Sequence, residues 1–161
     1  MLFRSFLPQA PEVKNGRRVA LVGAGPASLT VANDLLPLGY EVVIYEKNHE
    51  PGGLMRINIP SFRLPARVLD EECGSIIDMG AEMRYGTPVT SLKALLDEGY
   101  DAVFIGSGAP KGKDLDIPGR RDDPAHVHIG IEWLANGHFK HFEKIRSEEH
   151  TSELQSRFGI S

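Results

Sequence analysis

The chain has 161 residues, with 18 Lys and Arg against 22 Asp and Glu, and a net charge of −4 at pH 7. This mildly acidic balance argues against a nucleic-acid partner, and no apolar run approaches the ~20 residues that span a bilayer. The single cysteine, Cys73, excludes an internal disulfide and a Cys-X-X-Cys redox pair. We therefore expect a cytoplasmic protein with neither a membrane nor a nucleic acid as partner.

The two ends of the chain differ from the segment between them. Leu2-Phe3-Arg4-Ser5 can be encoded by CTC TTC CGA TCT, and Arg146-Ser147-Glu148-Glu149 by AGA TCG GAA GAG. These strings are reverse complements and resemble the adapters that are ligated to sequencing-library inserts. We therefore expect residues 1–5 and 146–161 to be adapter-derived and leave them out of fold reasoning. The alternative is a natural polar tail.

A glycine-rich turn lies between two apolar runs. Val19 to Val22 leads into Gly23-Ala24-Gly25-Pro26-Ala27-Ser28, and a second run ends at Glu46. Strand, glycine turn, helix, strand and acid form the dinucleotide-binding fingerprint. Gly23 permits the tight turn, Gly25 lets the backbone approach a pyrophosphate, and the helix N-terminus offers free N–H groups to it. Glu46 can accept bonds from ribose hydroxyls and would repel a 2′-phosphate, which favours FAD or NAD over NADP.

The third position of the motif is Ser28 where the pattern has glycine. Ser28, Val31, Ala32 and Leu35 recur with helical spacing and predict the buried stripe of the first helix. A small residue is needed at this position because the helix lies close to the first strand. Serine is small, and its hydroxyl can bond to a carbonyl one turn earlier.

The elements alternate between strand and helix along the chain. After a linker over residues 6–16 we predict, in order, a strand over Arg18–Val22, a helix over Pro26–Leu38, a strand over Glu41–Tyr45, an irregular loop from Lys47 to Pro65, a helix from Ala66 to Met79, a strand over Glu82–Tyr85, a helix capped by Ser91 and running to Glu98, a strand over Ala102–Ile105, and a short helix near Ile129–Ala135. This order predicts an α/β fold, a Rossmann-like parallel sheet covered on both faces. Ligand then lies at the carboxyl ends of the strands, near Gly23 and Gly106.

Several segments together resemble one family of flavoproteins. They are Gly23 to Leu29, Glu46 to Leu54, Ile59 to Pro65, Gly106 to Ala109 and Ile117 to Arg120. In these the chain resembles the FAD-binding lobe of the glutamate synthase small-subunit class of oxidoreductases, which includes the flavin region of dihydropyrimidine dehydrogenase. The resemblance implies an incomplete, truncated FAD-binding domain over residues 17–125. It also implies a connector over 126–145 towards a missing NAD(P)H domain.

The resemblance also implies roles for individual residues. Gly23, Ala24, Gly25, Pro26 and Ala27 would bind the FAD pyrophosphate, and Glu46 the adenosine ribose. Further cofactor-binding residues are Gly52, Gly53 and Leu54 beside the flavin end, Arg63 on the flavin nucleotide, Val89 at the adenine, and Gly106, Ser107 and Gly108 at a strand end. The alternatives are a surface arginine at Arg63 and a plain turn at Gly52-Gly53.

The function implied is that of a piece of an enzyme. The parent protein would take hydride from NAD(P)H onto FAD and pass electrons to another redox centre, such as an iron–sulfur subunit or domain. NAD(P)H would bind only in the parent, and this chain alone would bind FAD weakly without turnover. We expect no catalytic side chain and no metal site. The alternatives are a stand-alone, non-enzymatic dinucleotide-binding module and a non-functional truncated fragment.

Three other residue types have simpler interpretations. Cys73 lies in a helical run and is expected to be a packed small residue. His126 and His128 lack further ligands at useful spacing, so a metal site there is not expected. Trp133 is expected to pack the last helix onto the sheet.

Overall fold

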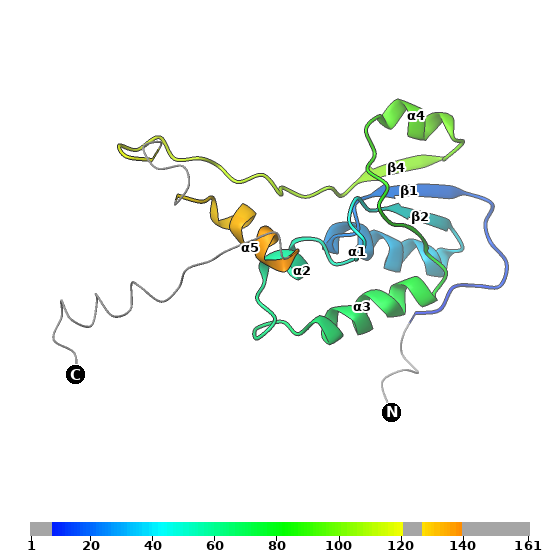
Figure 1. Cartoon of the computed structure of the whole chain (residues 1–161). Coiled ribbons are helices and arrows are strands. Elements are labelled where there is room, and N and C mark those ends of the chain that lie inside the picture. Colours follow the sequence, from blue (N-terminus) through cyan, green and yellow to red (C-terminus); the bar gives the residue numbers. More distant parts are fainter. Residues whose placement is uncertain (1–7, 121–126, 140–161) are drawn as a thin grey trace.

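Four short parallel strands form the centre of the protein. The computed structural model describes residues 8–120 and 127–139, with β1 at Arg18–Val22, β2 at Glu41–Tyr45, β3 at Glu82–Arg84 and β4 at Ala102–Ile105. The sheet order is β3-β2-β1-β4 (Figure 1). Val22 pairs with Tyr45 on one side and with Ile105 on the other. The carboxyl ends of β1, β2 and β4 therefore meet at one edge.

The first helix follows the sequence prediction closely. α1 spans Pro26–Leu35 and continues as a 3-10 turn, η2, over Leu36–Leu38. Pro26 occupies the start of the helix, where its missing N–H costs nothing. Pro37 has no N–H to donate to the α-helical ladder, which explains why the last turn tightens. Gly39, with φ +82°, ends the segment.

The sequence predicts an irregular loop from Lys47 to Pro65, and this prediction is wrong in part. It contains α2, a helix over Leu54–Asn58 that begins directly after Gly53. A helix of five residues has too few positions to establish a period, so its pattern gave no signal. Such a short helix is also unstable in isolation and depends on tertiary contacts.

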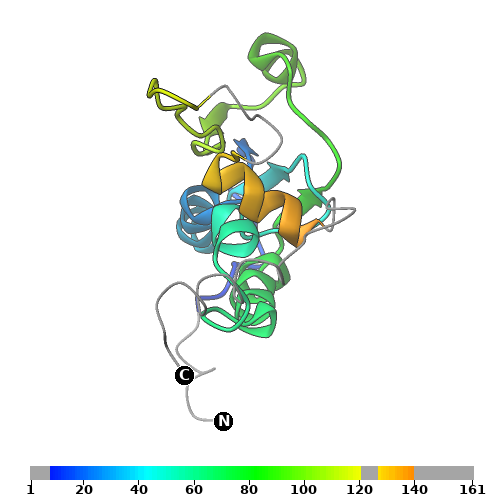
Figure 2. The same ribbon diagram turned by 60° about the vertical axis from the view of Figure 1, so that its left-hand side comes forward.

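The remaining helices match their predicted places to within a few residues. α3 spans Ala66–Asp78, α4 spans Leu92–Asp97, and α5 spans Gly130–His138. Ser91 caps α4 as expected, since its Oγ accepts a hydrogen bond from the Ala94 N–H at 3.2 Å. α5 packs against α2 (Figure 2). Trp133 lines a cavity beside α2, so the expectation that it packs onto the sheet is wrong.

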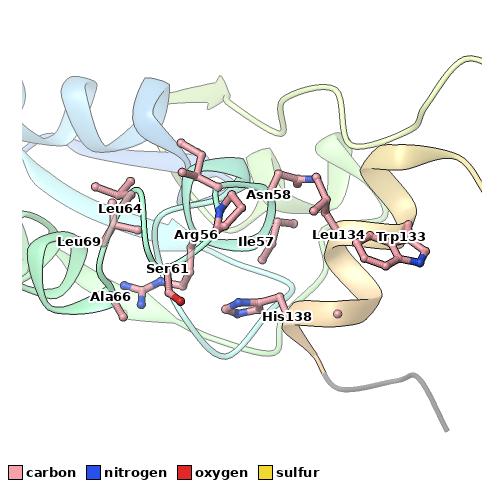
Figure 3. A pocket seen from close by; sticks show the side chains of 13 residues that line it. Arg56, Ile57, Asn58, Ser61, Leu64, Ala66, Leu69, Trp133, Leu134 and His138 are labelled. Atoms are coloured by element: carbon pink, nitrogen blue, oxygen red, sulfur yellow. The ribbon is translucent and has the colours of Figure 1, made fainter. Parts of the chain in front are cut away.

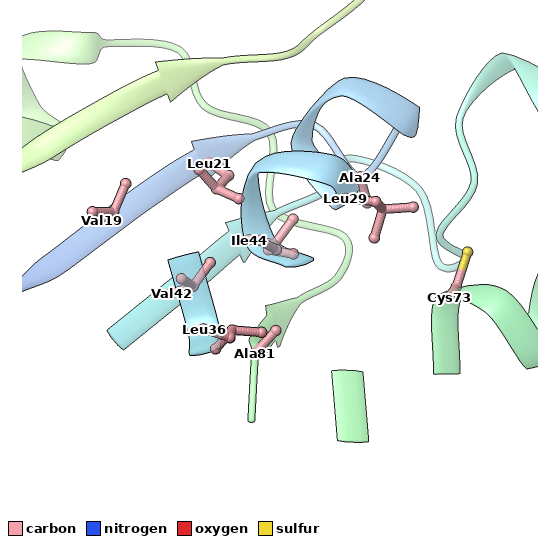
Figure 4. Packing of buried hydrophobic residues seen from close by; sticks show 10 residues of the cluster. Val19, Leu21, Ala24, Leu29, Leu36, Val42, Ile44, Cys73 and Ala81 are labelled. Carbon is pink, nitrogen blue, oxygen red and sulfur yellow. The ribbon is translucent and has the colours of Figure 1, made fainter. Parts of the chain in front are cut away.

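Both faces of the sheet are covered, as the consecutive apolar positions of its strands predicted. Figure 1 shows α1 and α3 on one face and α4 on the other. The larger core lies under α1 and α3, where Leu21, Ile44 and Leu36 are fully buried (Figure 4). Burial of each such side chain stabilises the fold by about 1.5–3 kcal/mol. The predicted Rossmann-like parallel architecture is confirmed.

Cys73 lies within this larger core. Its residue is 3% exposed and belongs to the cluster between the sheet and α3. Burial raises the pKa of the Cys73 thiol. The expectation of a packed small residue is confirmed.

Candidate dinucleotide-binding site

A cavity of about 480 Å³ lies at the carboxyl ends of the strands. It contains most of the residues that the motifs singled out. These are Gly23, Gly25, Pro26, Ala27, Glu46, Gly53, Leu54, Gly106, Ser107 and Gly108. The turn after β1, the end of β2, the start of α2 and the turn after β4 each supply part of the wall. Residues far apart in the sequence thus meet where a parallel sheet binds its ligands.

The turn at Gly23 is fixed by both neighbouring strands. Its N–H donates to the Tyr45 carbonyl at 2.7 Å, and its φ is +93°. A Cβ on Gly23 would lie 2.7 Å from the Gly106 carbonyl oxygen. The turns after β1 and β4 are therefore in direct backbone contact, and only glycine fits at Gly23.

A second close backbone contact joins the start of α2 to the start of α1. A Cβ on Gly53 would lie 2.8 Å from the Gly25 Cα, and the Gly52 N–H donates to the Ala24 carbonyl at 2.8 Å. Gly25 itself has no neighbouring atom closer than 4.0 Å to its would-be Cβ. As the N-cap it has no side chain to bind the first N–H groups of α1. Those donors therefore remain for a ligand.

Glu46 is a buried carboxylate in the wall of this cavity. Its residue is 5% exposed. Oε2 accepts a hydrogen bond from the Ala24 N–H at 2.7 Å, and Oε1 accepts one from the Asn48 N–H at 2.8 Å. Each carboxylate oxygen has a second lone pair, so Glu46 can still accept hydroxyl donors from a ribose. The two backbone bonds hold the carboxylate in place for this.

Four of the residues assigned by resemblance lie outside the cavity wall. Ala24 and Gly52 are buried next to residues of the wall, and the Gly52 N–H donates a hydrogen bond to the Ala24 carbonyl. Arg63 is exposed on the turn after Pro60, and Val89 is half-buried against the core on the α4 side. The structure therefore does not bring Arg63 or Val89 to the cavity. Their roles stay predictions.

The cavity wall also contains residues that sequence reasoning missed. They are Lys47, Asn48, Met55, Ile57, Ile105 and Pro110. Asn48, Met55 and Ile57 lie beside or within α2 and the loop before it, which the sequence presented as irregular. Ile105 is the last residue of β4, so its position next to the Gly106 turn was the available signal.

Ser28 lies at the contact between α1 and the turn after β4. It is fully buried, and a Cβ on Gly106 would overlap its hydroxyl oxygen. Among residues 8–120 and 127–139, Ser28 Oγ has no hydrogen-bond partner. The possible bond to a carbonyl one turn earlier is therefore not formed. The need for a small residue at this position is confirmed, because Gly106 leaves no further room.

A second cavity of about 380 Å³ lies behind α2 (Figure 3). Its wall includes Arg56 and Leu69 on one side and Trp133 and His138 of α5 on the other. Ile57 lines both cavities. The Asn58 side-chain amide donates to the Ile131 carbonyl at 3.0 Å and ties α5 to α2. α2 thus lies between the dinucleotide cavity and this second cavity.

The described residues contain neither a candidate membrane span nor a candidate metal site. Within the described part of the chain, no helix combines the length and apolar character that crossing a bilayer requires. Within the same residues, no group of three or more His, Cys, Asp or Glu could hold a metal ion. His126 lies outside the described residues.

Comparisons with known proteins agree with this geometry. Residues 21–82 match the family model described as an NAD(P)-binding Rossmann-like domain. The chain is 39% identical over 132 residues to glutamate synthase (NADH) of Schizosaccharomyces pombe, covering 80% of this chain and 6% of that protein. It is 40% identical over 126 residues to the NAD-dependent dihydropyrimidine dehydrogenase subunit PreT homolog of Salmonella typhi, covering 77% and 30%. The chain thus spans less than a third of either relative.

The fold has close counterparts among solved structures. FprA of Mycobacterium tuberculosis, solved in complex with NADPH, superposes with a TM-score of 0.66 at 22% identity, over 74% of this chain and 28% of that one. At this identity the likeness concerns the fold alone. Residues 21–82 of this chain have a Rossmann-like fold and match the NAD(P)-binding family model, and the homologues of the chain include glutamate synthase and the dihydropyrimidine dehydrogenase subunit PreT, as its motifs predicted.

Proposed function

We propose that this chain binds FAD in the cavity at the carboxyl ends of β1, β2 and β4. The diphosphate would lie at the N-terminus of α1, and the adenosine ribose on Glu46. The observation that carries this proposal is the buried Glu46 carboxylate beside the uncapped tip of α1. Donors suited to a diphosphate and an acceptor suited to sugar hydroxyls thereby share one wall.

The residues present fit such a ligand. No atom lies closer than 4.0 Å to a Cβ built on Gly25, and none lies within 4 Å of one on Gly108, so a ligand can approach the backbone at both places. Leu54, Met55 and Ile57 supply an apolar surface along α2. FAD, when bound, would supply the hydride and electron transfer, while the chain supplies position and electrostatics.

We propose further that the parent protein is an NAD(P)H-dependent flavoprotein oxidoreductase. It would move electrons from NAD(P)H through FAD to another redox centre, and residues 17–125 would be its FAD-binding domain. The relatives support this, since one is named for NADH and another is an NAD-dependent dehydrogenase subunit. The second relative is named as a subunit, which supports the proposal that the parent protein passes electrons to a separate redox partner. That this chain alone is inactive, and that it is cytoplasmic, stay predictions.

One observation favours NAD(H) as a second candidate ligand. The matching family model is described as NAD(P)-binding, and it covers the turn at Gly23 together with Glu46. The same cavity wall can hold either diphosphate. Glu46 disfavours the 2′-phosphate of NADPH because its buried carboxylate would repel that charge.

A titration of the folded full chain tests both candidates. We expect FAD to bind saturably, with quenched flavin fluorescence and shifted backbone amide signals at Gly25 and Glu46. Tighter binding of NADH than of FAD would favour the second candidate. Unmoved signals at both residues with every dinucleotide would overturn the site itself.

A further inference from the structure

Arg56 is a buried cation close to the dinucleotide cavity. It lies in α2, and only 6% of its side chain is exposed. A buried guanidinium is costly unless its donors are matched by acceptors. α2 is too short to be stable alone, so the contacts of Arg56 contribute to holding it in place.

The guanidinium joins the loop before α2 to helix α3. Its Nε donates to the Pro51 carbonyl, and a terminal nitrogen donates to Asp70 Oδ1 at 2.7 Å. Glu50 Oε2 lies 3.9 Å from the same Nε and 3.4 Å from His138 Nε2 of α5. Figure 3 shows His138 projecting from α5 toward Arg56. Arg56 thus connects α2 to the loop before it and to α3, and Glu50 extends this network to His138 of α5.

The Gly52–Gly53 turn lies between these contacts and the cavity. A Cβ on Gly52 would be 3.3 Å from Arg56 Cβ and 3.4 Å from its Nε, so the arginine stem lies directly against the turn. On the other side, Gly53 is in backbone contact with Gly25. Arg56 does not line the dinucleotide cavity itself. Any effect it has on a ligand is therefore indirect, and the Gly52–Gly53 turn offers a route for it because it contacts both Arg56 and Gly25.

We propose that Arg56 is a positioning residue for the dinucleotide site. Its guanidinium, held by Pro51 and Asp70, sets the Gly52–Gly53 turn against Gly25 and so shapes the diphosphate end of the cavity. This inference rests on the proposed function of the cavity. Arginine suits the task better than lysine, because its planar fork bonds in two fixed directions at once.

Three variants of the full chain test the proposal by affinity. Arg56→Met removes the fork, and Asp70 is left with its side chain 62% exposed, so no buried carboxylate loses its partner. We expect FAD to bind at least tenfold more weakly, and AMP, which lacks the second phosphate, less than twofold more weakly. Arg56→Lys should recover only part of the FAD affinity. Arg67→Met, on the exposed face of α3, is the matched control and should change neither ligand.

The outcomes separate positioning from loss of folding. A partly unfolded variant would lose FAD and AMP affinity by the same factor, and that result would overturn the proposal. Unchanged FAD binding in Arg56→Met, or full recovery in Arg56→Lys, would overturn it as well. Spectra of the ligand-free chain provide a second test, since Arg56→Met should shift the Gly53 and Gly25 amides and leave Gly39 unmoved. If the unaltered chain binds no FAD but the Gly53 and Gly25 amides shift in Arg56→Met, the proposal of FAD as the ligand is wrong. The contact through which Arg56 positions the turn would then still be supported.

Discussion

Glu46 Oε2 accepts a hydrogen bond from the Ala24 N–H at 2.7 Å, which joins the end of β2 to the turn that follows β1. The other carboxylate oxygen is held by the Asn48 N–H. The acid that faces the ribose in our proposal is thus also part of the fold. Its carboxylate fixes the glycine turn through the bond to Ala24, and the remaining lone pairs of its oxygens stay available to a ligand in the cavity.

Replacing this carboxylate by an amide should weaken both the fold and the site. In Glu46→Gln the side-chain NH₂ would face a backbone N–H donor, so one of the two bonds is lost. We expect a loss of about 1–3 kcal/mol in the free energy of unfolding, measured in urea. FAD affinity should fall on the order of tenfold by fluorescence titration. Glu72→Gln on α3 is the exposed control, and an equal loss there would contradict the argument.

The contact between Gly53 and Gly25 predicts a difference between two glycines that both have a positive φ. Gly53 has φ +54° with ψ −137°, and Gly99 has φ +85°, so an alanine is strained at either position. Only at Gly53 would the new Cβ also strike a backbone atom, whereas nothing lies within 4 Å at Gly99. Gly53→Ala should abolish FAD binding, and Gly99→Ala should preserve it. Equal retention of affinity in both variants would show that the turn is not part of the site.

Ser28 and Gly106 should behave as an energetically coupled pair. Ser28→Ala removes a buried hydroxyl without a hydrogen-bond partner among the described residues and should raise stability by about 1 kcal/mol. Gly106→Ala should destabilise by about 1–3 kcal/mol, because its Cβ overlaps Ser28 Oγ. The double variant should recover part of that loss. Strict additivity in chemical denaturation would mean that the two side chains do not compete for space.

The raised pKa of Cys73 predicts slow thiol chemistry and a pH-dependent stability. Burial favours the neutral thiol in the folded state, so the unfolded chain loses its proton first. Stability from this group is complete below the unfolded pKa of ~8.5 and declines as pH rises through it. Between pH 7 and 9.5 the free energy of unfolding of the Cys73→Ala variant should fall less than that of the unaltered chain. Rapid reaction of the native thiol with a disulfide reagent at pH 8 would contradict its burial.

Local signals were sufficient wherever one segment fixes its own geometry. The four strands, the helix that starts at Pro26 and ends near Gly39, and the Ser91 cap agree with prediction because each depends on residues a few positions apart. The convergence of Gly23, Glu46 and Gly106 was also predictable, since carboxyl ends of parallel strands share one edge.

The parts that the sequence could not supply depend on contacts between distant segments. α2 has too few residues to show a period. The Asn58 bond to Ile131 ties α5 to α2, and the buried Arg56 is paired with Pro51 and Asp70, which lie five and fourteen residues away in the sequence. The sequence by itself determined the order along the chain of the strands and of the helices other than α2, together with the chemistry of the glycine turn and its acid, because those follow from local conformational preference. Tertiary structure alone decided which polar groups were desolvated and paired, because burial is a property of all the segments that surround a side chain.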